Sequence, residues 1–237
     1  MDFMDKFYGS FSGFLIFHTV SARKIFIQVL ETPNPLTLKF VPGMPILGQG
    51  RGTLQFDSIK EAKISPLAMQ LLRVSGIRRV FFGEDFITIT KQNEEEDWSL
   101  MKPEIFSTIM DFLQSGRSII VDDYLPSGPE DTEIHSDDDD TVAMIKELLE
   151  SRIKPMVQED GGDVIYKGFI DGVVHLKLQG SCTGCPSSSV TLKSGIKNML
   201  QFYVPEVIDI MEVKDESNDI SEKAFKEFDE KIENEKT

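Results

Sequence analysis

The sequence predicts two small α+β domains that are joined by an acidic, flexible linker. Short runs of β-branched and aromatic residues alternate with helical apolar patterns on both sides of residues 117–140. Residues 117–140 contain one arginine and nine acidic residues, whereas the flanking blocks 24–116 and 141–213 are nearly neutral. A chain of 237 residues with 40% hydrophobic content is long enough for two domains with real cores.

Residues 1–23 precede the first predicted strand, and we expect them to be a leader that is disordered or serves targeting. Their apolar run, residues 11–20, is too short to span a bilayer. A mitochondrial transit peptide is rich in arginine and poor in acid, but this segment has one arginine and contains Asp2 and Asp5. It is therefore an atypical transit peptide.

Residues 24–116 are predicted to form strands and two helices. Ser65 is a suitable N-cap before Pro66, which favours a helix start there. This block has no cysteine and no histidine, so we expect no catalytic site in it. The expected elements are a strand over 25–30, an extended segment over 38–40, a glycine-rich loop over 48–52, a helix from Pro66, a hairpin over 80–90 and a second helix opening at Lys102–Pro103.

Residues 117–140 are predicted to be an extended, mobile tether because like charges repel and few apolar residues are present. We expect His135 to be solvated within it. The acidic residues 137–140 precede the next helix, where they complement its N-terminal dipole. The net charge of −15 disfavours binding to nucleic acid or to anionic membranes.

Residues 141–213 predict the order helix, strand, strand, cysteine turn, helix, strand. The Ile170-Asp171-Gly172 turn indicates a hairpin between the two central strands. His175 alternates with the apolar residues of its strand, so we expect it on the opposite face, at the surface. Pro155 is expected to kink or end the first helix. Residues 214–237 form a charged tail.

The only two cysteines, Cys182 and Cys185, lie in the turn before the helix that starts at Pro186. Two thiolates at this spacing can bind one metal centre or form one disulfide, but a tetrahedral site or an iron–sulfur cluster needs four ligands. A two-fold pair of such turns, from two copies of the chain, supplies four thiolates.

The setting of the turn bears on its chemistry. A helix N-terminus favours thiolates, and Gly180 and Gly184 are expected to leave room around exposed sulfurs for an inorganic core. Zinc or iron–sulfur binding, a redox-active disulfide and a structurally idle pair all remain open. A thioredoxin-type motif follows a parallel strand, whereas a hairpin precedes this one, which disfavours the redox alternative.

The motifs together resemble a known family. Segments 159–163 (Glu-Asp-Gly-Gly-Asp) and 180–188 (Gly-Ser-Cys-Thr-Gly-Cys-Pro-Ser-Ser) resemble the C-terminal domain of the NifU family. Segments 32–35 (Thr-Pro-Asn-Pro), 65–68 (Ser-Pro-Leu-Ala) and 81–88 (Phe-Phe-Gly-Glu-Asp-Phe-Ile-Thr) resemble the Nfu N-terminal domain. The chain is similar to the mitochondrial NifU-like iron–sulfur scaffolds of animals.

This resemblance implies a non-enzymatic scaffold or carrier of the mitochondrial matrix. It implies that Cys182 and Cys185 of a homodimer bind one [4Fe–4S] cluster, or a [2Fe–2S] cluster through the same four thiolates. The cluster is then passed to apo-proteins, which in the family include lipoyl synthase and respiratory-chain proteins, in cooperation with other cluster-assembly factors. The alternative from the residues alone is a thiol–disulfide oxidoreductase that uses the same cysteine pair.

Overall fold

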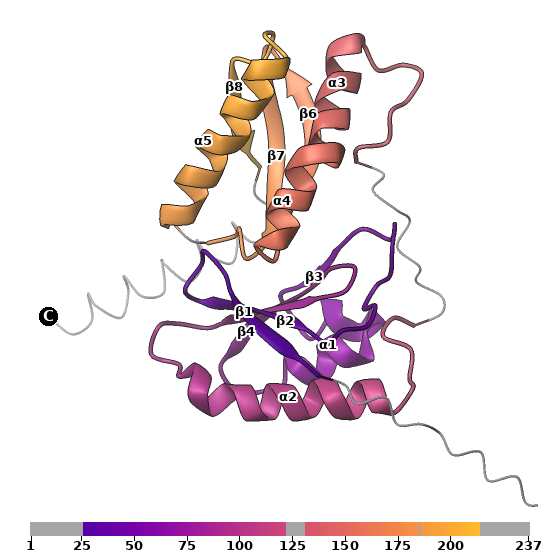
Figure 1. Ribbon diagram of the computed structural model, residues 1–237, viewed down its shortest axis with the longest axis vertical. Coiled ribbons are helices and arrows are strands. Elements are labelled where there is room, and N and C mark those ends of the chain that lie inside the picture. Colours follow the sequence, from indigo (N-terminus) through magenta and orange to yellow (C-terminus); the bar gives the residue numbers. More distant parts are fainter. Residues whose placement is uncertain (1–25, 122–130, 185, 214–237) are drawn as a thin grey trace, which may run out of the picture.

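The computed structural model describes residues 26–121, 131–184 and 186–213, with the side chains of residues 186–189 left aside. It shows two domains that each combine helices with a sheet, which confirms the predicted fold class (Figure 1). The predicted leader 1–23, the tail 214–237 and Cys185 lie outside the described residues. No helix in the described ranges is both long and apolar enough to cross a membrane.

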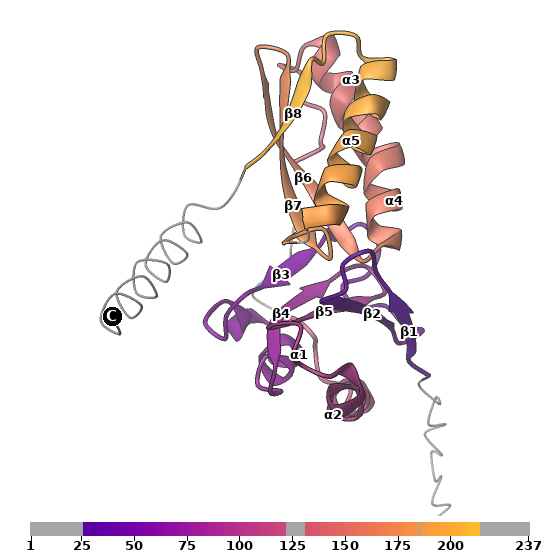
Figure 2. The ribbon, with the colours of Figure 1, turned by 90° about the vertical axis from the view of Figure 1, so that its left-hand side faces the viewer.

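The N-terminal domain is an antiparallel five-stranded sheet in the order β1-β2-β5-β4-β3, with helices α1 and α2 against one face (Figure 2). Its elements are β1 (Gln28–Glu31), β2 (Thr37–Val41), β3 (Leu54–Phe56), η1 (Glu61–Ile64), α1 (Pro66–Leu71), β4 (Ile77–Phe82), β5 (Ile87–Lys91) and α2 (Trp98–Gln114). The three-residue strand β3 was not predicted, because it is too short to show a period of two.

Of the two predicted helix starts in this domain, one is confirmed and the other is wrong. Helix α1 begins as predicted, with the Ser65 hydroxyl accepting from the Ala68 N–H at 3.2 Å. Helix α2 begins at Trp98, not at Lys102–Pro103, because Asp97 caps it by accepting from the Ser99 N–H at 2.8 Å. Pro103 lies inside this helix at the expense of one backbone hydrogen bond. The helix remains intact because its apolar stripe is buried, at Met101, Ile105, Ile109 and Phe112.

The central strands of the N-terminal sheet are buried on both faces. Side chains such as Phe40 and Ile89 point into the core beneath the helices. The alternate residues Lys39, Phe81 and Thr88 point to the other face, yet they too are buried. Figures 1 and 2 show why: the C-terminal domain sits on the face of the sheet that the helices leave free.

The C-terminal domain follows the predicted element order. Strands β6 and β7 form an antiparallel hairpin, and β8 lies parallel to β7. The helices pack on one face of this three-stranded sheet (Figure 2). A π-helical turn, η2, interrupts the first helix just before Pro155, which fits the predicted kink. The elements are α3 (Asp140–Leu148), η2 (Leu149–Ile153), α4 (Lys154–Glu159), β6 (Gly162–Ile170), β7 (Val173–Gly180), α5 (Pro186–Tyr203) and β8 (Asp209–Glu212).

The described ends of the predicted tether are packed, not extended. Asp131 pairs with Lys154 at 2.9 Å, and Asp138 pairs with Lys146 at 2.7 Å. Both lysines are only 5% exposed, so each needs a carboxylate beside it. At the other end, the Val121 N–H donates to the Ile64 carbonyl at 2.9 Å. The expectation of a mobile tether over all of 117–140 was therefore wrong for residues 117–121 and 131–140.

Candidate functional site

The cysteine turn follows β7 and faces the N-terminal sheet. Its backbone is held locally, since the Ser181 N–H donates to Gly161 O at 3.2 Å and the Cys182 N–H to Gln179 O at 3.3 Å. The Thr183 hydroxyl adds a bond to Leu178 O at 3.0 Å. These bonds tie the turn to the end of the β6–β7 hairpin.

Cys182 is buried, contrary to the expectation of an exposed thiolate. Its side chain is 6% exposed and belongs to the apolar core of the C-terminal domain. The sulfur lies against Gly162, where an added Cβ would be only 2.4 Å from Sγ. Burial raises the pKa of the Cys182 thiol to about 12; a hydrogen bond from Ser181 opposes this rise, and Asp160 adds to it. The thiol is therefore protonated at neutral pH.

The two glycines of the turn differ in role. Gly180 has φ +65°, and a Cβ there would lie 2.7 Å from Gly161 O and 3.0 Å from the Phe81 ring. It is thus required for close packing, not for room around the sulfurs as we expected. Gly184 is exposed, and an added Cβ there would meet no described heavy atom within 4 Å.

The N-terminal domain forms hydrogen bonds to the backbone on both sides of Cys182. The Asn34 amide donates to Ser181 O at 3.0 Å and to Thr183 O at 3.3 Å. The Gly180 N–H donates to Gln55 Oε1 at 2.9 Å. Asn34 is 1% exposed, so this contact is desolvated.

The neighbouring Gly161-Gly162-Asp163 segment is also held by the N-terminal domain. The Thr88 hydroxyl donates to Gly161 O at 2.7 Å, and the Thr53 hydroxyl donates to Asp163 Oδ2 at 2.6 Å. Burial raises the pKa of Asp163, while the Thr53 hydrogen bond acts in the opposite direction.

Lys39 binds the C-terminal end of helix α4. Its Nζ donates to Gln158 O at 2.8 Å and to Glu159 O at 3.2 Å, the last carbonyls of that helix. The negative end of the helix dipole favours a cation there. The ammonium also lies 4.1 Å from the centre of the Phe86 ring. Burial lowers the pKa of Lys39, although nearby Asp85 opposes that shift.

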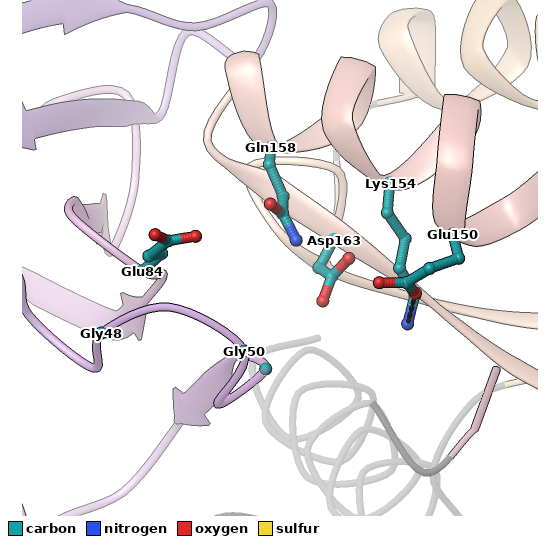
Figure 3. A pocket seen from close by; sticks show the side chains of 8 residues that line it. Gly48, Gly50, Glu84, Glu150, Lys154, Gln158 and Asp163 are labelled. Atoms are coloured by element: carbon teal, nitrogen blue, oxygen red, sulfur yellow. Dashed lines mark ion pairs between the residues drawn. The ribbon is translucent and has the colours of Figure 1, made fainter. Parts of the chain in front are cut away.

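A cavity of about 110 Å³ opens between the domains beside these contacts (Figure 3). Figure 3 shows the ion pair of Lys154 with Glu150 at its side. The predicted glycine loop of the N-terminal domain contributes to one wall. Residues of η2, α4 and β6 in the C-terminal domain form the other. Its lining consists of Gly48, Gly50, Gly52, Glu84, Glu150, Lys154, Gln158 and Asp163. The described residues contain no group of three or more His, Cys, Asp and Glu side chains that could hold a metal ion.

Sequence reasoning missed the N-terminal residues that bind the cysteine turn, the Gly161–Asp163 segment and the end of α4: Asn34, Lys39, Thr53, Gln55 and Thr88. A signal was present, since Lys39 and Thr88 each stand between apolar strand residues. Such alternation identifies a polar face, but a solvated face and a face covered by a polar partner give the same pattern.

Comparison with known families matches both domains. A family model described as "Scaffold protein Nfu/NifU N terminal" matches residues 27–116. A second, described as "NifU-like domain", matches residues 145–211, a range that includes the cysteine turn.

Curated relatives match most of the chain. The "NFU1 iron-sulfur cluster scaffold homolog, mitochondrial" of Homo sapiens is 58% identical over 200 residues, covering 84% of this chain and 76% of the relative. The protein of the same name from Drosophila willistoni is 54% identical over 207 residues, covering 87% and 70%. A solution structure of a NifU-like protein from Saccharomyces cerevisiae is 28% identical with a TM-score of 0.40, and covers 52% of this chain and 99% of that one.

Proposed function

The chain belongs to the Nfu/NifU family of iron–sulfur cluster scaffold proteins, and from this premise we propose that two copies of it bind one [4Fe–4S] cluster and transfer it to apo-proteins. Cys182 and Cys185 of each copy are the proposed ligands. The cluster is cargo in this proposal, and no catalytic role is assigned to the chain.

The proposal rests on the number and place of the cysteines. The whole chain has two, both in the turn before α5. Each copy thus supplies two of the four thiolates that a cluster requires, and a two-fold axis through the cluster supplies the rest. The same four thiolates also fit a [2Fe–2S] cluster, which is the alternative for the type of cluster that is bound.

The environment of the turn bears on both ligation and release, since the Cys182 thiol must lose a proton before it can bind a cluster. Ligation requires the thiolate, so binding of the cluster displaces the proton that burial holds on Cys182. The N-terminus of α5 stabilises negative charge near the ligands. A cluster shared between two chains has few ligands from either one, so an apo-protein with a full ligand set can extract it.

The setting in the cell follows from the relatives. The relatives from Homo sapiens and Drosophila willistoni are named as mitochondrial, so we place this chain in the mitochondrion. Its proposed partners are a second copy of itself, cluster-assembly factors that load it, and apo-proteins with vacant cluster sites.

A thiol–disulfide oxidoreductase is the weaker alternative. Its attacking cysteine must be accessible and thiolate-like, whereas Cys182 is buried and its pKa is raised. The strand setting, by contrast, does not separate the two functions, because β7, which precedes the turn, is antiparallel to β6 and parallel to β8.

Anaerobic reconstitution tests the proposal. The wild-type protein should bind about four iron and four sulfide per two chains, and it should sediment as a dimer only when loaded. Cys182→Ser and Cys185→Ser should lose the cluster and stay monomeric. Thr183→Ser is the matched control in the same turn, because serine retains the hydroxyl that bonds Leu178 O. Full cluster content in either cysteine variant would reject the ligand assignment, and rapid reduction of a test disulfide by the apo-protein would favour the alternative.

A further inference from the structure

One face of the N-terminal sheet is not covered by helices and has the composition of a binding surface. We call it the helix-free face; its residues are Lys39, Gln55, Phe81 and Thr88, with the adjoining Asn34. Phe81 is fully buried and Phe86 is 3% exposed, although neither belongs to the core beneath α1 and α2. Their rings lie 6.0 Å apart, and Phe81 lies against Gly180 of the other domain. An apolar pair ringed by hydrogen-bonding groups is typical of the centre of an interface.

We propose that this helix-free face is a docking surface for the cysteine turn of the same chain, and that docking and cluster ligation exclude each other. The second part rests on the proposed function. The domain arrangement described above is then a closed apo form, and loading requires it to open.

The exclusion follows from the contacts around Cys182. The Asn34 amide occupies both carbonyls that flank this cysteine, and Gln55 occupies the Gly180 N–H. The sulfur itself is directed against Gly162. Four thiolates can meet only if the Cys182 sulfur leaves this buried position, and the bonds from Asn34 and to Gln55 hold the backbone on both sides of it in place.

The same-chain partner is favoured by the connection between the domains. Val121 belongs to the N-terminal domain and Asp131 to the C-terminal one, so the ten Cα–Cα steps between them limit their separation to about 36 Å even when fully extended. Such a connection gives an effective local concentration in the millimolar range, which a second chain at ordinary concentrations does not reach.

Asn34→Asp tests the docking surface in the full-length apo-protein. Aspartate keeps the oxygen that accepts from the Leu36 N–H at 3.0 Å, but replaces the donor to Ser181 O and Thr183 O by a repelling oxygen. The control is Asn93→Asp, whose oxygen accepts from neighbouring N–H groups in an exposed turn. We expect alkylation of Cys182 by N-ethylmaleimide, followed by tandem mass spectrometry, to speed up about tenfold in the first variant and to stay at the wild-type rate in the second.

Thr88→Val, with its own control variant, is an independent test of the docking surface that carries little risk to folding. It removes the hydroxyl that donates to Gly161 O while keeping the shape of the side chain. Thr90→Val is its control on the same strand and the same face, because the Thr90 hydroxyl has no hydrogen-bond partner in the described part of the chain. The radius of gyration from small-angle X-ray scattering should rise in Thr88→Val and Asn34→Asp only. Equal values in variants and controls would overturn the docking surface.

Cluster loading tests the exclusion separately. Asn34→Asp should load several-fold faster than Asn93→Asp and reach the same final content, and loaded wild-type protein should show the larger radius of gyration per chain. A loaded protein that keeps amide protection on β5 at the apo level would overturn the exclusion while leaving the scaffold function intact. If neither protein binds a cluster, the proposed function fails, and the apo-protein measurements still decide the docking surface.

Discussion

Replacement of Asp131 by asparagine tests whether the end of the acidic segment is part of the C-terminal domain. Asp131 accepts from Lys154 Nζ at 2.9 Å and from the Tyr166 N–H at 2.8 Å. The side chains of Asp131 and Lys154 are 17% and 7% exposed. In Asp131→Asn, one oxygen must serve two donors, and the charge that balances Lys154 is lost.

The cost follows from the burial of the pair. Removing one partner of a buried ion pair costs about 3–5 kcal/mol. We expect about 2 kcal/mol here because Glu150 Oε2 remains 3.3 Å from Lys154 Nζ and retains part of the attraction. A loss of that size corresponds to about a 30-fold rise in the opening equilibrium of the domain.

Amide hydrogen exchange followed by mass spectrometry measures this loss domain by domain. Protection of residues 162–180 should fall about 30-fold in Asp131→Asn, whereas protection of residues 77–91 should not change. Asp137→Asn is the control, since Asp137 is an exposed acid of the same segment with no ion pair to the described residues. Equal protection in the two variants would refute the structural role of Asp131 and restore the interpretation of a simple tether.

Three further outcomes are expected. The hydrogen bond from Lys146 lowers the pKa of Asp138 below its ordinary 3.8, so this contact stabilises the fold above pH 3.8 and is lost as pH falls below it. Asp138→Asn should thus reduce resistance to urea at pH 7 but not at pH 2. Gly180→Ala should lower the free energy of unfolding by about 2 kcal/mol, because of its positive φ and the 2.7 Å approach of its Cβ to Gly161 O. Gly195→Ala should raise it by up to about 1 kcal/mol, because Gly195 lies inside α5 and an added Cβ would meet no described heavy atom within 4 Å outside the backbone of that helix; thermal denaturation measures both glycine variants.

Features that depend on neighbouring residues were predictable. Ser65 caps α1 because its hydroxyl reaches an N–H three residues ahead. The hairpin turn needs positive φ at Asp171 and Gly172, which these residue types tolerate. The prediction of where α2 starts was wrong because two local signals competed. The cap at Asp97 sets the start, and Pro103 is tolerated inside the helix because burial of the apolar stripe outweighs one missing hydrogen bond.

The sequence by itself determined two α+β domains, their element order and the two-thiol deficit of the cysteine turn. Only the tertiary structure decided that Asp131 and Asp138 neutralise buried lysines, and that the N-terminal sheet covers the turn around Cys182. The physical reason is the same in both cases. A run of charges or an alternating strand pattern indicates which groups are polar. Their hydrogen-bond and ion-pair partners lie far away in the chain, so only the folded structure shows whether water or protein satisfies them.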